Sequence, residues 1–241
     1  MSKSRIDSLM VERGLVESRA KAQALIMAGE VMVDGKLVTK SGALVAEGAV
    51  ISIAEPPPFV GRGGIKLDYA LDQFHLDVSG RVAADIGAST GGFTDCLLKR
   101  GASRVYAIDV GYGQLDYRLR QDKRVVVMER INARYPITLP EKVDLATIDV
   151  SFISVEKVIP PVSQALKGDG HLVVLIKPQF EARREEVGKG GVIKQPSVHV
   201  LVLGRFIKWA ISKSFRLGGL VASPVLGASG NREFFMLLRL T

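Results

Sequence analysis

The sequence has little of what disulfide or metal chemistry requires. It contains one cysteine, Cys96, in 241 residues, which excludes an internal disulfide and a cysteine cluster for zinc or iron–sulfur. Its three histidines are scattered without the spacing of a metal site, so no metal is expected. No apolar run approaches the roughly 18 residues of a membrane-spanning helix, and the N-terminal MSKSRIDSLMVERG lacks the apolar core of a signal peptide. We therefore expect a cytoplasmic protein.

The chain is instead rich in positive charge. Lys and Arg number 33 against 25 Asp and Glu, which gives a net charge of +8. An excess of this size favours a polyanionic partner, nucleic acid before membrane. The excess lies entirely in residues 59–241, because residues 1–58 hold seven acidic and seven basic side chains.

Three consecutive prolines divide the chain. Residues 55–62, EPPPFVGR, cannot continue a helix or a central strand, so they predict a stiff, extended linker. Residues 1–54 then form one predicted domain and residues 63–241 another. In the first domain we expect a helix near residues 5–13, a second helix that Ser18 caps and Gly29 ends, and a hairpin that turns at Asp34-Gly35.

Strands and helices alternate in the second domain. Strand patterns occur at residues 81–87, 104–110, 124–129, 143–150 and 171–178, and helix patterns at 90–101, 154–167 and 197–214. This alternation predicts an α/β fold, with a largely parallel sheet covered by helices on both faces. The last two apolar runs are joined only by GASGNR, so we expect them to be antiparallel neighbours.

The stretch DIGASTGGF, from Asp85 to Phe93, follows the first of these strands. Its glycines allow a ligand to approach the backbone, but their spacing fits neither the dinucleotide fingerprint nor a Walker A loop. Asp85 suits a cationic ligand better than a pyrophosphate, and Asp109, at the tip of the second strand, can bind ribose hydroxyls. These features favour S-adenosylmethionine, whose sulfonium and ammonium groups are both cationic.

Eight stretches, in order along the chain, carry a family resemblance. They are GRGGIKL (61–67), DIGASTGGFTDCLL (85–98), DVGYGQLDYRLR (109–120), INARY (131–135), DVSFIS (149–154), IKPQFEA (176–182), KGGVI (189–193) and GNREFF (230–235). As a set they resemble the TlyA-type, or hemolysin A, branch of the FtsJ-like ribosomal RNA 2′-O-methyltransferases. Residues 5–36 also resemble the small RNA-binding domain named after ribosomal protein S-four. Gly61 is one departure, since relatives often carry serine there.

The resemblance implies a fold and an activity. The fold would be a Rossmann-like class I methyltransferase with a mostly parallel seven-stranded sheet, its last strand antiparallel, after a small α+β RNA-binding domain. The activity would be S-adenosylmethionine-dependent 2′-O-methylation of cytidine in large-subunit (23S) RNA, with small-subunit (16S) RNA as a second candidate. Two other function classes stay open, a hemolysin or cytolysin and a non-catalytic RNA-binding assembly factor.

The resemblance also implies a catalytic tetrad, at Lys66, Asp149, Lys177 and Glu233. The strand pattern agrees, because Asp149 and Lys177 end neighbouring strands, where open α/β sheets bind ligands. Glu233 begins the last strand, which reaches the same edge if it is antiparallel. Lys177 would act as the base or steer an oxygen lone pair. Lys66 is expected in the first turn of a helix, where the helix dipole disfavours a cation and a solvated surface lysine is the default interpretation.

Further residues are expected to contact the cofactor and the RNA. The expected cofactor-binding residues are Asp85, Gly87, Ser89, Gly91, Gly92, Phe93, Asp109, Asn132, Ala133 and Asp149. The expected RNA-binding residues are Arg5, Arg19, Lys21, Lys36, Lys40, Arg62, Arg183, Arg184 and Lys189. The last three lie in a polar loop, residues 181–195, which we interpret as a mobile flap over RNA or else a disordered surface loop. The expected partners are ribosomal RNA and ribosomal subunits.

Overall fold

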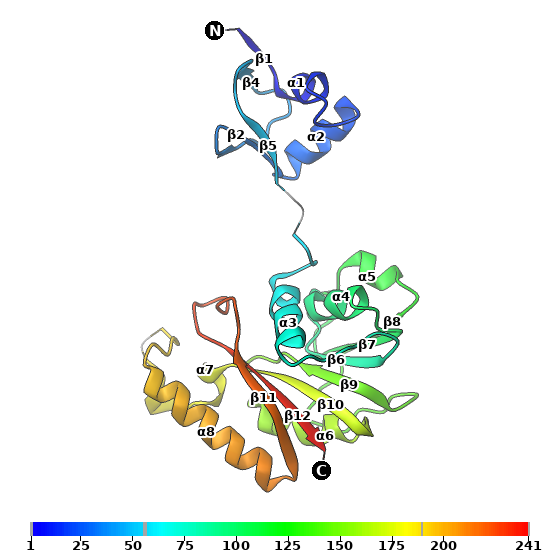
Figure 1. Ribbon diagram of the computed structural model, residues 1–241, viewed down its shortest axis with the longest axis vertical. Coiled ribbons are helices and arrows are strands. Elements are labelled where there is room, and N and C mark those ends of the chain that lie inside the picture. Colours follow the sequence, from blue (N-terminus) through cyan, green and yellow to red (C-terminus); the bar gives the residue numbers. More distant parts are fainter. Residues whose placement is uncertain (1, 55–56, 189, 241) are drawn as a thin grey trace. The chain divides into compact units, whose positions relative to one another are not determined.

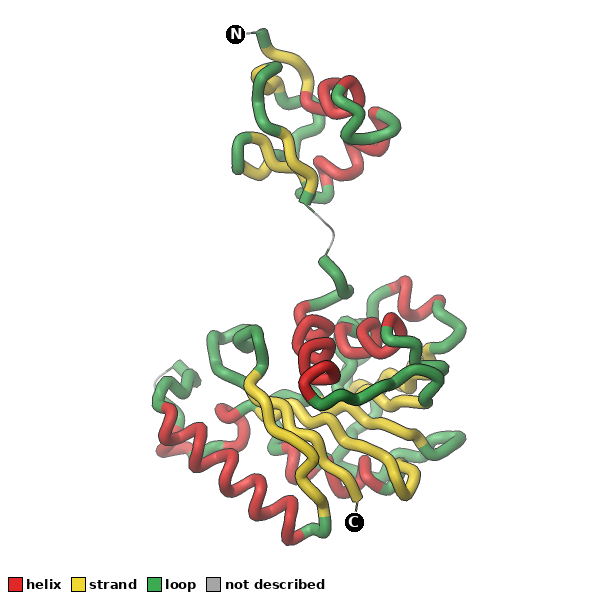
Figure 2. The backbone as a smooth tube through the Cα atoms, viewed as in Figure 1, coloured by secondary structure: helices red, strands yellow, loops and turns green. Residues whose placement is uncertain are grey.

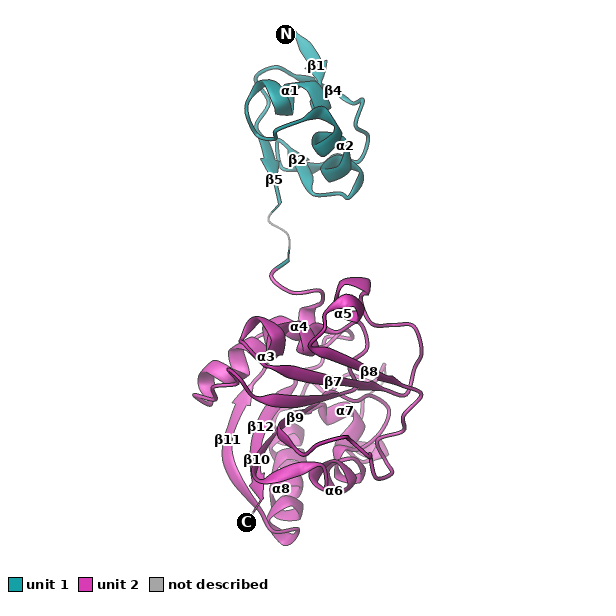
Figure 3. Ribbon diagram, turned by 90° about the vertical axis from the view of Figure 1, so that its right-hand side faces the viewer, with its two compact units in different colours: residues 1–57 teal, residues 58–241 magenta. Residues whose placement is uncertain are grey.

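The structure is a computed structural model of the chain, and it describes residues 2–54, 57–188 and 190–240. The chain divides into two compact units, Met1–Pro57 and Pro58–Thr241 (Figure 3). Each unit has a hydrophobic core of its own. The predicted linker residues 55–56 and the predicted RNA contact Lys189 lie outside the described residues.

The first unit packs two helices against two small antiparallel sheets. One sheet pairs β1 with β4, and the other has the order β3-β2-β5. Buried apolar side chains of both helices meet those of β2 and β5 in one cluster. The elements are β1 (Lys3–Arg5), α1 (Ile6–Glu12), α2 (Arg19–Met27), β2 (Val31–Val33), β3 (Lys36–Leu37), β4 (Leu44–Ala46) and β5 (Ile51–Ile53).

The local signals predicted for this unit are confirmed. The Ser18 side chain accepts a hydrogen bond from the Lys21 backbone N–H, as an N-cap does. Gly29 adopts a φ of 75° just after α2. Asp34 and Gly35 both have positive φ, 48° and 76°, and they connect β2 to β3 as a two-residue hairpin turn.

The second unit is an α/β fold, as predicted (Figure 1, Figure 2). Its sheet has seven strands in the order β11-β12-β10-β9-β6-β7-β8. Its first elements are α3 (Arg62–Gln73), β6 (Val82–Ile86), α4 (Gly92–Lys99), β7 (Arg104–Asp109), α5 (Tyr117–Gln121), β8 (Val125–Glu129) and β9 (Val143–Ile148). The remaining elements are the 3₁₀ helix η1 (Val155–Lys157), α6 (Ile159–Ser163), β10 (Leu166–Ile176), α7 (Pro178–Glu181), η2 (Arg184–Glu186), α8 (Pro196–Ser212), β11 (Phe215–Ala222) and β12 (Phe234–Leu240).

The direction of the strands also agrees with the prediction. Parallel pairing joins β8, β7, β6, β9 and β10 in turn. Strand β12 is antiparallel to both of its neighbours, β10 and β11, and the hairpin between β11 and β12 is the one that GASGNR predicted. Because parallel strands present their carboxyl ends at one edge, the loops after β6, β7, β9 and β10 lie together there.

Alternate residues of the central strands enter two different cores. Ala83 and Leu145 pack with side chains of α3 and α4 on one face of the sheet. Ala84 and Ala146 pack with side chains of α6 and α8 on the other. Figure 1 shows these helix pairs on opposite sides of the sheet. The period of two along each strand is what allows one sheet to bury both faces.

The predicted helix over residues 154–167 is wrong in its bounds. The chain forms η1 and then α6, which covers only Ile159–Ser163, and β10 already begins at Leu166. Proline lacks the backbone N–H that a helix interior needs, so Pro160 and Pro161 fit only near a helix start. The helix therefore starts at Ile159, later than the apolar pattern suggested.

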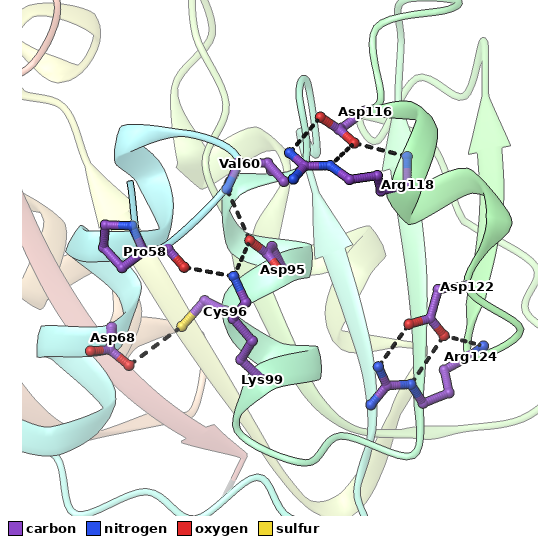
Figure 4. A network of polar contacts seen from close by, with 10 residues as sticks. All are labelled: Pro58, Val60, Asp68, Asp95, Cys96, Lys99, Asp116, Arg118, Asp122 and Arg124. Carbon is purple, nitrogen blue, oxygen red and sulfur yellow. Dashed lines mark hydrogen bonds and ion pairs between the residues drawn. The ribbon is translucent and has the colours of Figure 1, made fainter. Parts of the chain in front are cut away.

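Residues 58–60 are anchored to the second unit (Figure 4). Lys99 Nζ donates to the Pro58 carbonyl at 2.6 Å, and the Val60 N–H donates to Asp95 Oδ2 at 2.9 Å. The Phe59 ring between them is buried beneath Lys99 and joins the core of α3 and α4. The expected linker therefore ends earlier in the structure, since α3 starts at Arg62.

Candidate active site

A cavity of about 940 Å³ opens at the carboxyl ends of β6, β7 and β9. Its volume falls in the range of roughly 300 to 1,000 Å³ that is usual for small-molecule sites. Six of the residues expected at the cofactor line it, namely Gly87, Ser89, Asp109, Asn132, Ala133 and Asp149. The cavity thus lies where the strand order and the loop sequences placed the cofactor.

Asp109 organises the wall of the cavity next to the glycine loop. Its Oδ2 accepts from the Ser89 N–H at 2.8 Å, and its Oδ1 accepts from the Gly111 N–H at 2.6 Å. Each carboxylate oxygen has a second lone pair, so Asp109 retains the capacity to accept from a ligand. Gly87 has a φ of 85°, and a Cβ there would overlap the Asp149 carbonyl, so only glycine fits this turn.

Asp85 does not line the cavity, contrary to a direct role with a cationic ligand. It is 1% exposed and accepts from the Thr94 hydroxyl at 2.7 Å and the Thr147 hydroxyl at 3.0 Å. Burial raises the pKa of this carboxyl to about 7. The two threonine hydroxyls satisfy the side chain within the core, so the structure places Asp85 behind the glycine loop.

Gly91, Gly92 and Phe93 also lie away from the cavity lining. A Cβ at Gly92 would stand 3.0 Å from the Gly64 backbone nitrogen, so this glycine permits the close approach of α4 to α3. Phe93 is buried, with its ring 6.0 Å from that of Phe235. Gly91 and Gly92 therefore serve helix packing and the sharp start of α4, where Gly91 has a φ of 98°, while Gly87 alone of the three loop glycines lines the cavity.

The expected catalytic tetrad forms two ion pairs. Lys66 Nζ lies 2.6 Å from Glu233 Oε2, and Lys177 Nζ lies 2.6 Å from Asp149 Oδ1. The sheet explains the second pair, because Asp149 follows β9 and Lys177 follows the adjacent parallel strand β10. Ile176 pairs with Phe234 across β10 and β12, which brings Glu233 to the same edge.

The two ion pairs differ in their exposure. The side chains of Lys66 and Glu233 are 9% and 4% exposed, whereas those of Lys177 and Asp149 are 12% and 22% exposed. Asp149 lines the cavity, and Lys177 also donates to Ser151 Oγ at 2.8 Å. Lys177 is thus the lysine tied directly to the cavity wall, while Lys66 is held within the protein.

Lys66 lies one turn deeper in its helix than predicted. Helix α3 begins at Arg62, so Lys66 is its fifth residue and escapes most of the unfavourable dipole at the first turn. Its ammonium is neutralised by a carboxylate 167 residues later in the chain. The interpretation as a solvated surface lysine is wrong, because the residue is 7% exposed.

An aromatic pair at the mouth of the cavity was missed in the sequence. The rings of Phe152 and Phe180 lie 5.0 Å apart, and both residues line the cavity. Phe152 is 91% exposed and has a φ of 62°, which is uncommon for a bulky residue. Such strain recurs at functional sites. The available signal was an aromatic residue three positions after the acid that ends β9.

Several hydrogen bonds anchor described residues of the loop over residues 181–195 to other segments. Glu181 accepts from the Ser154 hydroxyl at 2.6 Å, and Glu186 receives two bonds from Arg205. Asn231, which is 1% exposed, donates to the Gly191 carbonyl and accepts from the Ile193 N–H, each at 2.9 Å. The sequence did not single out these anchors, since each joins segments far apart in the chain.

The expected RNA contacts that the structure describes are all exposed. They are Arg5, Arg19, Lys21, Lys36, Lys40, Arg62, Arg183 and Arg184. Two of them, Arg5 and Arg19, share one buried carboxylate, that of Asp7.

The described residues include no group of His, Cys, Asp and Glu side chains suited to a metal ion. They also form no helix with the length and apolar character needed to cross a membrane.

Comparisons with known proteins cover nearly the whole chain. The profile of the FtsJ-like methyltransferase family matches residues 59–240, and that of the S4 domain matches residues 4–51. A Bacillus subtilis protein provisionally named rRNA methyltransferase YqxC is 45% identical, over 98% of this chain and 85% of its own. The Mycobacterium tuberculosis 16S/23S rRNA (cytidine-2'-O)-methyltransferase TlyA is 42% identical, over 98% and 90%. A solved structure from Streptococcus thermophilus, provisionally named a hemolysin, has a TM-score of 0.76 at 42% identity and covers 100% of this chain and 90% of that one.

Proposed function

The chain belongs to the FtsJ-like methyltransferase family, and from this premise we propose that it methylates a ribose 2′-hydroxyl of ribosomal RNA, with S-adenosylmethionine as the methyl donor. The observation that carries the proposal is the position of Asp149, which lines the cavity and binds Lys177. One carboxylate thus joins a site for a small cofactor to an ammonium group at its edge. The family match agrees with the resemblance expected from the eight sequence stretches.

The residues of the cavity fit a methylated nucleoside cofactor. S-adenosylmethionine supplies an electrophilic methyl group on a cationic sulfur. We assign the ribose hydroxyls to Asp109, whose oxygens retain free lone pairs, and the adenine to the turn at Asn132 and Ala133. Asp149 would accept from the ammonium of the methionine part. Gly87 and Ser89 would complete the wall, while Asp85, Gly91, Gly92 and Phe93 would support the loop from behind.

The tetrad would prepare the acceptor hydroxyl. A ribose 2′-hydroxyl is a poor nucleophile and must lose its proton as its oxygen attacks carbon. We assign Lys177 to accept that proton or to steer a lone pair of the oxygen, with Asp149 and Ser151 orienting its Nζ. Lys66 and Glu233 fix the neighbouring wall as a buried, neutral pair. Most of the acceleration would come from alignment of oxygen and methyl carbon.

The aromatic pair of Phe152 and Phe180 would receive the target base. An exposed ring at the mouth of the cavity offers a stacking surface, which contributes about 1 to 3 kcal/mol per base in other proteins. A nucleotide turned out of its helix could stack there while its ribose reaches Lys177. We propose cytidine as the base, following the relative from Mycobacterium tuberculosis.

The first unit would bind RNA and the second would catalyse methyl transfer. We propose residues 1–54 as the RNA-binding domain, a linker that ends before Pro58, and residues 58–241 as the catalytic domain, acting on ribosomal RNA within ribosomal subunits in the cytoplasm. Supporting this, the S4 profile matches the first unit, and the basic excess of the second unit suits a polyanion. Arg62, Arg183 and Arg184 are the exposed cations of the second unit that we assign to RNA phosphates.

Methyl transfer is the direct test. Purified protein, labelled S-adenosylmethionine and ribosomal subunits from a strain that lacks the gene should yield labelled RNA, with the label mapped to a cytidine 2′-oxygen. Lys177→Ala should abolish transfer. Lys167→Ala is the matched control, because Lys167 also forms an ion pair, with Asp144 at 2.7 Å, but lies near the amino end of β10. Transfer by Lys177→Ala at the control's rate would reject the proposed chemistry.

A hemolysin role, suggested by the name of the Streptococcus thermophilus structure, needs its own assay. Lysis of red cells by wild-type protein and equally by Lys177→Ala, without methyl transfer by either, would favour that role. RNA binding without transfer by wild-type protein would favour a non-catalytic assembly factor. We expect transfer without lysis.

A further inference from the structure

A buried carboxylate joins two of the exposed arginines of the first unit. Asp7, in α1, is 0% exposed. Arg5 donates to it through Nε at 3.0 Å and Nη2 at 2.9 Å, and Arg19 donates through Nε at 2.9 Å. Gln23 adds a further bond at 2.9 Å. Two guanidinium groups from different elements are therefore fixed side by side.

Both arginines have donors left over. Among contacts between described residues, Arg5 leaves Nη1 without a partner and Arg19 leaves both of its Nη groups. Their side chains are 46% and 53% exposed. Arg13 of the same unit is different, because both of its Nη groups donate to backbone carbonyls of Glu47 and Ala49. In both arginines, one side of the guanidinium group is thus bound to Asp7 and the other side is free to bind a ligand.

The backbone holds each arginine in place as well. Arg5 pairs with Leu44 across β1 and β4, and the next residue, Ile6, donates to the Ala43 carbonyl at 2.9 Å. Arg19 is the first residue of α2, directly after the Ser18 cap. Gly42 packs against the Arg5 guanidinium, since a Cβ there would lie 3.4 Å from both Nη atoms. Position 42 therefore lies beside the Nη atoms of Arg5.

Charge explains why a carboxylate is needed there. Two guanidinium groups at this separation repel each other, and a buried carboxylate between them offsets the repulsion. The hydrogen bond from Arg5 is the largest cause that holds the pKa of Asp7 far below its usual range, with Gln23 and Arg19 acting in the same direction. Asp7 therefore stays ionised at any physiological pH.

We propose that Arg5 and Arg19, held side by side by Asp7, clamp a single phosphodiester of the substrate RNA, with Asp7 as a positioning residue. The proposal rests on the RNA-binding role proposed for the first unit. A guanidinium fork matches the oxygens of a phosphate, and two pre-oriented forks lose little entropy on binding. The first unit holds equal numbers of acidic and basic residues. Its affinity for RNA therefore depends on arrangement rather than on net charge.

The Asp7→Asn variant tests the proposal, because the clamp and the net charge predict opposite changes in RNA affinity. Asp7→Asn removes a negative charge, so long-range electrostatics alone predict tighter RNA binding. The clamp predicts binding weaker by roughly tenfold or more, the scale of lost charge-assisted hydrogen bonds. The measurement is the Kd of the full-length protein for protein-free ribosomal RNA from a strain lacking the gene. Glu12→Gln is the matched control, because it removes the same charge from an exposed site on α1. It should bind as wild type or slightly more tightly.

A second set of variants covers the case in which Asp7→Asn disturbs folding. Arg5→Lys and Arg19→Lys keep the charge but lose the fork, and each should weaken binding. The double variant should lose little more than either single variant, because both side chains hold one phosphate. Cofactor binding, which belongs to the second unit, should be unchanged in all of them.

The outcomes separate the clamp from the function on which it rests. Wild-type affinity in Asp7→Asn and in both lysine variants, with methyl transfer intact, would overturn the clamp alone. Additive losses from Arg5→Lys and Arg19→Lys would overturn the single shared phosphate. Failure of the wild-type protein to bind ribosomal RNA would overturn the clamp together with the RNA-binding role.

Discussion

Lys66 contacts a residue that its sequence neighbourhood does not contain. Its ammonium lies within the protein against Glu233, and both side chains are nearly inaccessible to water. Two opposite charges taken from water are costly, and removing one leaves the other unpaired in a poorly solvated position. The pair therefore constrains the contact between α3 and the start of β12 more strongly than a surface ion pair could.

Lys66→Ala should lower methyl transfer by roughly 10²-fold or more, the usual scale for the loss of a positioned charged group in an active site. Cofactor binding should stay close to that of the wild type, because Lys66 is not among the residues that line the cavity. The measurement is single-turnover transfer to unmodified ribosomal RNA at saturating S-adenosylmethionine.

Lys66→Arg separates charge from shape. A planar guanidinium keeps the positive charge but does not fit where a compact ammonium lies 2.6 Å from Glu233 in a closed space. Rescue should therefore be partial. Full activity in this variant would mean that charge alone is required, and full activity in Lys66→Ala would remove Lys66 from the mechanism.

Asp85 should make the stability of the second unit depend on pH. Burial raises the pKa of its carboxyl to about 7, so between about pH 4 and 7 the folded state binds the proton more tightly than the unfolded chain. The stabilising contribution of this proton is complete below about pH 4 and is lost as the pH rises to about 7. Relative to wild type, Asp85→Asn should gain free energy of unfolding across that interval and change no further above it.

Urea unfolding of both proteins at several pH values from about 4.5 to 8 measures this difference. Other titrating groups cancel in the comparison, because both proteins contain them. A difference that does not change with pH would mean that Asp85 is already ionised in the folded protein at low pH, and that its two threonine partners outweigh its burial.

The sequence predicts which site residues lie together where the ends of strands determine their positions. Asp149 and Lys177 each follow an apolar strand, so the parallel sheet brings them together. Asp7 and Asn231 could not be predicted, because their partners come from segments whose contact depends on tertiary packing. Asp85 was assigned to the ligand because a sequence does not reveal which side of a strand end faces the cavity.

At the scale of elements, α3 and α4 pack unusually closely. Gly63 and Gly64 of α3 face Gly92 of α4, where a Cβ would stand about 3 Å from backbone atoms. The Phe59 ring lies directly against Gly64, since a Cβ at position 64 would overlap it. The absence of side chains at these positions allows the helices to approach and the Phe59 ring to enter the core.

Gly64→Ala should destabilise the second unit by about 1 to 3 kcal/mol, the usual cost of overpacking, because the added methyl group would displace the Phe59 ring. Gly204→Ala is the matched control within α8. A Cβ there meets nothing within 4 Å, so alanine should stabilise the helix by about 0.5 to 1 kcal/mol. Urea midpoints for the two variants should shift in opposite directions, and equal shifts would contradict this account of the packing.

Elements marked by a long apolar run, a cap or a turn signal were predictable, whereas short strands without such a signal were not. The strands β6, β7, β8 and β9 appear in the sequence as apolar runs bounded by glycine or charged residues. The strands β4 and β5 have three residues each, too few for an alternation of polar and apolar side chains to show. The helix predicted over residues 154–167 had the wrong bounds because the apolar spacing there resembles a helix throughout. The two prolines limit where that helix can start.

At the scale of the whole molecule, the first residues of the second unit decide where it can be cut. A chain that starts at Pro58 keeps the bonds from Pro58 and Val60 to α4 and the buried Phe59 ring. It should fold, bind S-adenosylmethionine as the full chain does, and lose most of its affinity for ribosomal RNA. Calorimetry for the cofactor and filter binding for the RNA provide the two measurements.

A chain that starts at Arg62 is the comparison. It lacks Phe59, so it should be less stable by about 2 kcal/mol or more, on the scale of a large buried side chain removed from a core. Equal stability of the two shortened chains would show that residues 58–61 contribute nothing to the second unit. Undiminished RNA methylation by the longer of them would rule out the first unit as the main RNA contact.

Strand β12, which follows Glu233, lies inside the sheet between β10 and β11 although it is translated after both. A nascent chain that still has this strand in the exit tunnel of the ribosome therefore presents β10 with an open edge and lacks the partner of Lys66. Until that strand emerges, the sheet is incomplete and the edge of β10 is open to pairing with another chain.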